Sequence, residues 1–575
     1  MSMSEEKREV SIELLLYGLV LVGALAVRVY ALGRWPLQDE EAGLALAAWR
    51  FGQGVPATLR WHSPLLFHAN GLLFFLTGGS DNLARSWCVL FGSLLTLWPY
   101  GLRRHLGKGG ALTAALVLAF SPGLTYFSRA VSGDVIVVFC SLGLLVSVVR
   151  YVEERRTVWV LAAAGLSALA LLAGPSFYSV VVMLGTSGLF LYMRSRSGRD
   201  AGRVAELREA WADVLVDGRA RRGALSIAAV LFLGVGTAFM LNPAGLQMTL
   251  DQFGLWLGGF GSGAAPWYRG LLVLALYEAL PLFLGAVGLY LGWRSRGLFN
   301  TLVRCWFVVA MALCVVRGAR APQSALLVLV PLVLSAGRAA EHLWQATKET
   351  AKIPMFWVLV VLSLSISAAI YVQLALYLLS PVRVYMLRMG ALCLFVASAH
   401  ALVGSMGDWK VALCAAGTAL VVLLGFGMVR AGVRVNYVRA REPTEPLVGR
   451  TTSPDVLELA RQTTRLSSRM DGDPRTLSWL VDETLEVPLG WYMRDFEQVS
   501  YVPSVQGALD VGGVIAPVHA PAPERFVGLR YRVHSEPSGT KYPAVDWMRW
   551  WTGHKSSIES SASGEDVMLW VKSAQ

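Results

Sequence analysis

Long apolar runs separated by short polar connectors dominate the pattern of residues 1–430. Each run has the length that a helix needs to cross a bilayer, about 17 to 25 residues. The pattern predicts a polytopic α-helical membrane protein with about thirteen transmembrane helices, the first of them uncleaved. The runs begin near residues 11, 86, 109, 135, 157, 176, 223, 270, 298, 321, 354, 388 and 410.

Two shorter segments follow the first run, in the loop formed by residues 34–85. "AGLALAAWRFGQG" has the spacing of an amphipathic helix that lies at the membrane interface. "PLLFHANGLLFFLTGG", residues 64–79, is too short to span a bilayer, and we interpret it as an interfacial or re-entrant helix.

The pattern changes after Val433, where the sequence becomes polar. Ser453 followed by Pro454 predicts the start of an amphipathic helix. The runs "TLSWLVD", "QVSYV", "GVIAPV" and "RFVGLRYRV" predict strands, and "KSSIESSASGEDVML" includes a flexible polar segment. We therefore expect a transmembrane domain of residues 1–430 and a soluble α/β domain of residues 431–575.

Composition agrees with a membrane protein and excludes other classes. Hydrophobic residues make up 55% of the chain and charged residues only 16%, well below the usual share of a soluble domain. The net charge of +12 lies mostly in short connectors, which is a topology signal and not a nucleic-acid-binding surface. All six cysteines fall in apolar runs without metal-binding spacing, so neither a structural zinc site nor a disulfide framework is expected.

Basic connectors alternate with connectors that carry fewer cations. Because cytoplasmic loops are enriched in Lys and Arg, the alternation predicts a multi-pass plasma-membrane protein with a cytoplasmic N-terminus. The loop of residues 34–85 and the C-terminal domain are then extracytoplasmic. The basic connectors begin near residues 103, 150, 193, 293 and 337.

Acidic residues in the outward segments are the first candidates for chemistry. Asp39, Glu40 and Glu41 stand together after the first apolar run. They could form a solvated loop, act as a base or bind a divalent cation. Asp134 begins a later helix, where a carboxylate either caps the helix or contributes to a site.

Cations and one buried acid are further candidates. Arg317 and Arg320 lie at an outward helix end, where they could bind phosphate or simply extend toward the membrane surface. Arg129 precedes Asp134, and His62 lies in the first outer loop, where a lone histidine is more often structural than catalytic. Glu278 lies inside an apolar run, where an ionisable residue is costly and indicates a functional or structural partner.

Three N-terminal stretches resemble the GT-C membrane glycosyltransferases, which include protein O-mannosyltransferases and aminoarabinose transferases. They are "ALGRWPLQDEEAGLALAAWRFGQG", "HSPLLFHANGLLFFLTGGSDNLARSWCVLFGSLL" and "AFSPGLTYFSRAVSGDVIVVF". Later stretches, among them "LGWYMRDFEQVSYV" with Trp491, Tyr492, Arg494 and Asp495, resemble a bacterial and archaeal branch associated with flippase activity. In order and spacing, the resemblance extends over nearly the whole chain.

The resemblance implies an acidic pair in the first outer loop and a second acid at Asp134. The pair is Asp39–Glu40 or Glu40–Glu41, and the distance to Trp49 favours the second register. The chain departs from the family in "LAGPSFY" and in "RGARAPQ", which replaces an expected "EK-x-PW" segment. Arg317 or Arg320 can take the place of the missing Lys, whereas the missing Glu has no obvious substitute.

The resemblance therefore implies an inverting glycosyltransferase that moves a sugar from a polyprenyl-phosphate donor to a glycan, lipid or protein acceptor. One acid of the first loop would be the base. Asp134 would orient the acceptor or, with Glu40, hold Mg²⁺ or Mn²⁺. The remaining substrate-binding candidates are Arg129, His62, Arg317, Arg320 and Glu278.

Two alternatives remain. The first is a non-catalytic accessory or scaffold protein in lipid-linked glycan translocation or envelope assembly, which the departures from the family pattern favour slightly. The second is a transporter. The transporter is disfavoured because the ionisable residues gather at the outer edge of the membrane and because no paired broken helices are evident in the sequence.

Overall fold

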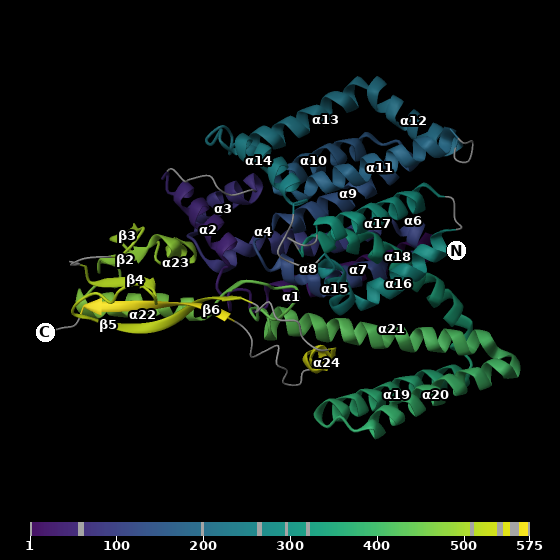
Figure 1. The fold of residues 1–575 in the computed structure, drawn as a ribbon. Helices are drawn as coiled ribbons and strands as arrows, with labels where there is room; N and C mark the ends of the chain where they lie inside the picture. The colour runs from purple at the N-terminus through teal and green to yellow at the C-terminus, as the bar shows by residue number, and fades with distance from the viewer. Residues whose placement is uncertain are drawn as a thin grey trace.

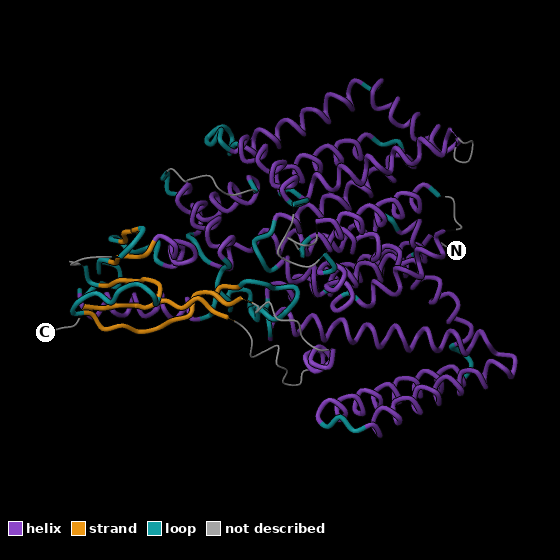
Figure 2. Tube along the Cα trace, viewed as in Figure 1, coloured by secondary structure: helices purple, strands orange, loops and turns teal. Residues whose placement is uncertain are grey.

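The computed structural model describes residues 3–55, 63–196, 201–261, 267–293, 297–317, 322–505, 511–536, 544–552 and 563–572. A bundle of helices makes up most of the molecule, and a smaller domain that contains the sheet is attached at one end (Figure 1). The N-terminus lies at the opposite end of the bundle (Figure 1). Within the described residues, the strands are confined to the C-terminal domain (Figure 2).

The bundle is built around α9 (Gly133–Glu154) and α18 (Ser324–Thr350). These two helices have 72% and 78% of their apolar windows buried, more than the other spans among the described residues. A helix that is apolar on all sides must be surrounded by other helices or lipid, so both form the centre of the bundle. The other helices are α1 (Met3–Val29), α4 (Asp81–Leu94), α5 (Trp98–Gly101), α6 (Arg103–Leu106), α7 (Lys108–Phe120), α8 (Pro122–Ser128), α10 (Thr157–Ala173), α11 (Ser176–Arg196), α12 (Ala201–Val216), α13 (Gly218–Val230), α14 (Gly245–Gly258), α15 (Arg269–Tyr277), α16 (Ala279–Trp293), α17 (Leu298–Arg317), α19 (Pro354–Leu379), α20 (Arg383–Val403) and α21 (Trp409–Val433).

The predicted number of about thirteen spans is not confirmed. In the part of the chain that the structure describes, seven helical runs are long and apolar enough to cross a membrane, or nine when each of two bent pairs is one span. One of the seven, Arg383–Val438, contains both α20 and α21, which are separated at Gly407 by a non-helical residue. The apolar helix α10 has 17 residues, fewer than the 18 required of a span.

The two bent pairs correct the expectation that broken helices are absent. α7 and α8 meet at 53°, and α15 and α16 meet at 99°. The two bends contact each other. At the first bend, Ser121 Oγ and Gly123 N both donate hydrogen bonds to Oε1 of Glu278 at the second bend (2.6 Å and 2.9 Å). The apolar runs conceal both bends, since only Glu278 and the Ser121–Pro122 step interrupt them.

Two helices of the first loop, α2 (Asp39–Gly52) and α3 (Pro64–Thr77), pack against each other as separate elements outside the long spans. They lie between the bundle and the C-terminal domain (Figure 1). Both predicted helices are confirmed. The Ser63 side chain accepts a hydrogen bond from Leu66 N (3.3 Å) and so caps the start of α3.

The C-terminal domain contains a six-stranded mixed sheet in the order β1-β5-β6-β4-β2-β3. β2 pairs in parallel with β3 and β4, and the other pairs are antiparallel. The predicted α/β domain is confirmed, and its core contains Val456, Trp479, Val481, Ile515 and Leu569. Its elements are β1 (Thr451–Thr452), α22 (Asp455–Met470), β2 (Trp479–Asp482), α23 (Glu486–Tyr492), β3 (Val499–Val502), β4 (Gly513–Pro517), β5 (Phe526–Glu536) and β6 (Ser563–Lys572). The intervening α24 (Ala544–Thr552) packs against α19 of the bundle.

All four predicted strands are present, and the structure adds one that was not predicted. Residues 563–569 of the run "KSSIESSASGEDVML" belong to β6, which pairs with both β4 and β5, whereas residues 555–562, where the flexible polar segment was predicted, lie outside the described residues. Sheet pairing on both sides supplies hydrogen bonds that the polar composition does not reveal. α22 begins at Asp455, and Ser453 Oγ accepts a hydrogen bond from Asp455 N (3.3 Å), close to the predicted helix start.

Candidate functional site

The three acids of the first loop occupy the first turn of α2, where a negative charge suits the helix dipole. The backbone N–H of Gln38 donates a hydrogen bond to Glu41 Oε2 (2.8 Å), which completes a capping box. Although Asp39, Glu40 and Glu41 are consecutive, successive residues point in different directions around a helix. The fold consequently places the three carboxylates in three different environments.

Glu41 is 3% exposed and belongs to a buried carboxylate cluster that it forms with Arg85 and Arg441. Arg85 Nη2 lies 2.9 Å and Arg441 Nη2 3.4 Å from Glu41 Oε2. Val131 N donates to the other carboxylate oxygen at 2.7 Å. Burial alone would raise the pKa of Glu41, but the two guanidinium groups prevail and lower it to about 2. Glu41 is therefore a permanently charged structural partner.

Arg85 extends this cluster to the chain segment that precedes α2. Its guanidinium donates to the carbonyl oxygens of Leu32 (2.9 Å), Trp35 (3.1 Å) and Pro36 (3.0 Å). Arg85 is 1% exposed, so its charge depends on Glu41 for compensation. The cluster thus holds the start of α2 against α4.

Asp39 faces the C-terminal sheet. His534 Nε2 lies 2.8 Å from Asp39 Oδ1, and Thr452 Oγ1 donates to the same oxygen at 3.3 Å. Arg450 Nε lies 4.0 Å from the other carboxylate oxygen. The first acid of the motif therefore contacts the C-terminal domain.

Glu40 is the exposed member of the three acids. Partial enclosure by the surrounding protein and then the negative charges of Asp134, Glu41 and Asp39 raise its pKa. Asp134, the second predicted acid, is thus among the charges that act on Glu40. An accessible carboxylate with a raised pKa can accept a proton, in contrast to the compensated Glu41.

Asp134 lines a small polar cleft where the first turns of α9 and α11 meet the end of α17. We define this polar cleft by Asp134, Ser176, Ser179, Arg317 and Gln323, which surround a cavity of about 110 Å³. The Ser176 hydroxyl donates a hydrogen bond to Asp134, and Arg317 Nη1 donates to Ser179 Oγ (3.2 Å). An acid and a cation thus share one cavity.

Aromatic rings hold Arg317 in the polar cleft. Its guanidinium lies 5.4 Å from the ring centroids of both Trp256 and Phe260. Trp256 Nε1 donates to Ser179 Oγ (2.9 Å), the same hydroxyl that accepts from Arg317. Arg317 is therefore oriented by stacking and by hydrogen bonding, as a phosphate-binding arginine requires.

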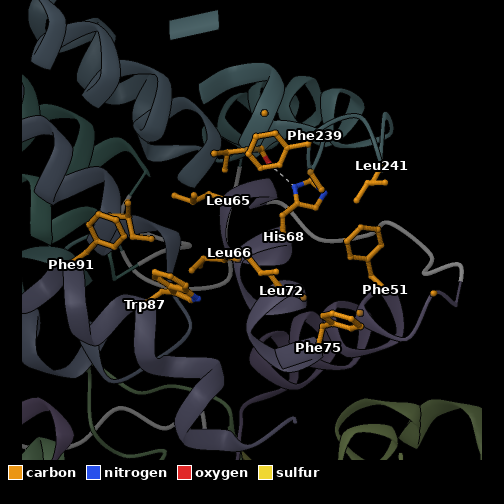
Figure 3. Close-up of a pocket in the computed structure, with 18 residues that line it drawn as sticks. Phe51, Leu65, Leu66, His68, Leu72, Phe75, Trp87, Phe91, Phe239 and Leu241 are labelled. Carbon is orange, nitrogen blue, oxygen red and sulfur yellow. Dashed lines mark hydrogen bonds between the residues drawn. The ribbon is translucent and has the colours of Figure 1, made fainter. Parts of the chain in front are cut away.

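A larger apolar pocket of about 680 Å³ opens beside α3. Aromatic and aliphatic side chains surround it, among them Phe51, Leu66, Phe75 and Phe239 (Figure 3). His68 is the polar side chain among the labelled residues, and its Nδ1 donates to the Val235 carbonyl oxygen (2.8 Å; Figure 3). Its Nε2 lies 3.0 Å from Asn242 Nδ2, so the imidazole is satisfied as a neutral ring.

The other predicted site residues lie elsewhere. Arg129 donates to carbonyl oxygens at the end of α1, including those of Arg28 (2.9 Å) and Tyr30, and is absent from the lining of the polar cleft. Glu278 is 1% exposed and joins the two helix bends. His62 and Arg320 lie outside the described residues.

A metal site is not assembled in the described part of the chain, where no group of three or more His, Cys, Asp or Glu side chains could hold an ion. Asp134 acts electrostatically on Glu40, but Glu40 is not among the residues that line the polar cleft. The proposed Mg²⁺ or Mn²⁺ site therefore stays a prediction.

The tail motif connects the C-terminal domain to the first loop. Trp491 Nε1 donates to Asp81 Oδ1 (2.7 Å), and the Tyr492 hydroxyl donates to Asp81 Oδ2 (3.0 Å). Leu37 N in turn donates to the Tyr492 hydroxyl (2.7 Å). Arg494 Nη2 donates to the Gly79 carbonyl oxygen (2.8 Å). These contacts make the motif an interdomain anchor beside the start of α2.

Sequence reasoning missed Arg85, Arg441, Ser179 and His534. Arg85 had a visible signal, because an arginine within the apolar stretch "LARSWCVLF" needs a partner. Arg441 and His534 had no local signal, since their partners are 400 and 495 residues away along the chain. Only the packing of the C-terminal domain on the first loop reveals them.

Comparisons with known proteins agree with this architecture. Residues 61–201 match the family of dolichyl-phosphate-mannose-protein mannosyltransferases. ArnT from Cupriavidus metallidurans in the apo state has a TM-score of 0.51 and 17% sequence identity, covering 85% of this chain and 86% of ArnT. ArnT bound to undecaprenyl phosphate also gives 0.51, with 18% identity over 84% of this chain and 85% of ArnT.

The archaeal oligosaccharyltransferase AglB from Archaeoglobus fulgidus, in complex with an inhibitory peptide and a dolichol-phosphate, gives a lower TM-score of 0.45 at 11% identity. That alignment covers 88% of this chain and 69% of AglB. A search of curated protein sequences finds no match. The likeness to ArnT covers most of both chains, and this protein therefore has the GT-C fold of membrane glycosyltransferases.

Proposed function

We propose that this protein is a membrane glycosyltransferase that moves a sugar from a polyprenyl-phosphate donor to a hydroxyl or amide of a glycan, lipid or protein acceptor. One observation carries the proposal. The first turn of α9 contributes Asp134 to the polar cleft and Ile136 to the apolar pocket. A lipid phosphate needs such a pairing of a polar site for its head with an apolar space for its tail.

The residues of the cleft, together with Glu40 in the first turn of α2, suit a single displacement with inversion. Glu40 takes the proton of the acceptor, whose oxygen or nitrogen attacks the anomeric carbon from the face opposite the phosphate. The bond between the anomeric carbon and the phosphate oxygen breaks, and polyprenyl phosphate leaves with the bonding electron pair. Arg317 stabilises the phosphate charge, and Asp134 orients the acceptor. The raised pKa of Glu40 brings this base closer to neutral pH.

The fold supports the class of donor. ArnT, which shares this fold, has been observed with undecaprenyl phosphate. In the proposed arrangement, the apolar pocket takes the first isoprene units and the cleft takes the phosphate. The charge pattern supports an active site on the extracytoplasmic face, with the N-terminus in the cytoplasm and the C-terminal domain outside, where envelope assembly partners are accessible.

The scaffold alternative predicts a different interior. A non-catalytic accessory protein has no need for a lipid-sized space beside an accessible acid, and its corresponding region would be packed. The apolar pocket of about 680 Å³ next to the polar cleft favours the enzyme.

The test is a transfer assay in liposomes with the purified full chain and a panel of labelled polyprenyl-phosphate sugars. We expect the wild type to release polyprenyl phosphate from at least one donor, and Glu40→Gln to lower the rate about 10²- to 10⁴-fold, as for loss of a general base. Glu458→Gln, on the exposed surface of α22, is the matched control and should retain full activity. Unchanged transfer in Glu40→Gln would contradict the assignment of the base, and a wild type inactive on every donor would contradict the proposed function.

A further inference from the structure

His534 lies between two carboxylates in the interface between the C-terminal sheet and α2. It is 3% exposed. Its Nε2 lies 2.8 Å from Asp39 Oδ1, and its Nδ1 lies 3.0 Å from Glu565 Oε2. The sheet register explains this position, because His534 on β5 pairs with Thr452 on β1 and with Glu565 on β6.

The two contacts determine the protonation state of the imidazole. An ionised carboxylate only accepts hydrogen bonds, and a neutral imidazole has only one N–H to donate. Hydrogen bonds from both ring nitrogens to Asp39 and Glu565 therefore require the imidazolium form. The positive charge also compensates two partly exposed carboxylates that would otherwise repel each other across the buried imidazole.

The surroundings of His534 contain three further groups. Arg450, in the segment before β1, lies 3.3 Å from Glu565 Oε2 and 3.2 Å from Glu536 Oε1. Thr452 donates to the Asp39 oxygen that His534 also contacts (3.3 Å). The charged groups that face His534 are thus Asp39 from α2, Glu565 from β6 and Arg450, with Glu536 behind Arg450.

This arrangement connects the C-terminal sheet to the proposed base through a single peptide bond. Asp39 is the first residue of α2, and Glu40 follows it directly. On the other side, Glu41 is held by Arg85 and Arg441. The backbone at Glu40 is therefore held from both neighbours, once by the buried carboxylate cluster and once by His534.

We propose that His534 is a positioning residue that, as an imidazolium held between Asp39 and Glu565, fixes the first turn of α2 and thereby the position of Glu40. The catalytic consequence rests on the proposed function, whereas the attachment of α2 to the sheet does not. Loss of the proton from His534 would place a ring lone pair against one of the two carboxylates. One hydrogen bond would then become a repulsion, and the first turn of α2 would loosen.

The direction of the pH effect follows from these contacts. Burial and the charge of Arg450 lower the pKa of His534, but the hydrogen bonds to Asp39 and Glu565 and the charge of Asp39 prevail and raise it above its ordinary value of 6.5. A raised pKa means that the stabilising contact is fully present below that ordinary value and is lost as the pH rises through the raised pKa. The attachment should therefore weaken on the alkaline side.

Two neutral substitutions separate this role from a general effect of charge. Gln in place of Glu565 can accept from the imidazolium or donate to the neutral ring, so Glu565→Gln tolerates both protonation states. Glu536→Gln removes the same charge from the same surroundings without contacting His534, and it is the matched control. His534→Gln removes the imidazolium at every pH.

The experiment measures hydrogen–deuterium exchange of the α2 amides in the full chain, in nanodiscs, with rates corrected for the pH dependence of intrinsic exchange. In the wild type and in Glu536→Gln, we expect the protection of the first turns of α2 to fall about tenfold or more as the pH rises through the pKa of His534, the factor typical of a lost charge-assisted hydrogen bond. Glu565→Gln should keep its protection across the range. His534→Gln should show the low value throughout.

Protection that is independent of pH in the wild type, or a pH dependence in Glu565→Gln equal to that of the wild type, would overturn the proposal. The transfer assay is the second measurement, and its alkaline loss of kcat should shift to higher pH or vanish in Glu565→Gln. If hydrogen–deuterium exchange shows the expected pH dependence but neither the wild type nor any variant transfers sugar, the proposed function fails and the positioning role stands. If transfer is observed but exchange is independent of pH, the positioning role fails alone.

Discussion

The buried carboxylate cluster and the polar cleft contain the same kinds of side chain, acids and arginines, but in different arrangements. In the cluster, Glu41 accepts from two guanidinium groups and two backbone N–H groups, and its pKa falls to about 2. In the cleft, Asp134 accepts from a serine hydroxyl, while Arg317 donates to another serine and stacks on two rings.

This difference indicates which acid is available for chemistry. A carboxylate surrounded by buried cations is held in its charged form and has no accessible place for a substrate. A carboxylate beside neutral hydroxyls and an open cavity can bind or exchange a proton. Glu40 is exposed, and partial enclosure and the charges of Asp134 and Glu41 raise its pKa, so its availability resembles that of the acid in the cleft. The availability of an acid thus depends on its donors more than on its position in the motif.

The sharpest way to test this contrast is to remove each acid in turn. Glu41→Ala leaves Arg85 and Arg441 buried without their shared anion, and we expect a loss of about 3–5 kcal/mol in the free energy of unfolding. Glu40→Ala removes an exposed side chain and should change stability by no more than about 0.5 kcal/mol. Unfolding in detergent, followed by tryptophan fluorescence, measures both. Equal stability of the two variants would remove the distinction between the regions.

Replacing Arg317 tests whether the cation of the cleft binds the donor phosphate. Arg317→Ala should raise KM for the lipid donor about 10- to 150-fold, equivalent to the loss of about 1.5–3 kcal/mol for a charged hydrogen bond. Ser179→Ala leaves the charge but removes the hydroxyl that orients it, so we expect a smaller rise in KM. If both variants kept the wild-type KM while Glu40→Gln lost activity, Arg317 would not be the group that binds the donor phosphate.

The smallest expected difference between the two regions lies in their pH dependence. Because the pKa of Glu40 is raised, transfer should decline as the pH falls through that raised value and the base becomes protonated. The depressed pKa of Glu41 contributes stability above its ordinary value of 4.5, and this stability is lost only as the pH falls toward about 2. Parallel pH profiles of kcat/KM and unfolding should therefore show the activity loss at the higher pH.

Asp134→Asn sharpens this measurement. Removing the negative charge beside Glu40 should lower the pKa of the base and move the acid limb of the residual activity to lower pH. An acid limb that stays in place would show that Glu40 does not titrate beside Asp134.

Local patterns predicted most of the elements but not their partners. The apolar runs predicted helices of the bundle, and short strand-like runs predicted β2, β3, β4 and β5. β6 was missed because its stability comes from pairing with β4 and β5, and the helix bends were missed because Glu278 finds its hydrogen-bond donors on another bent pair. In each case, the deciding interaction joins segments that are distant along the chain.

The sequence by itself determined the membrane class, the helical segments and the presence of acids at the start of α2, because hydrophobic length and helix-start signals are local. The tertiary structure decided what each acid does. Arg441 reaches Glu41 across 400 residues, and His534 reaches Asp39 across 495. Burial and hydrogen-bond partners control the charge and accessibility of a carboxylate, and both arise only when the C-terminal domain packs on the first loop.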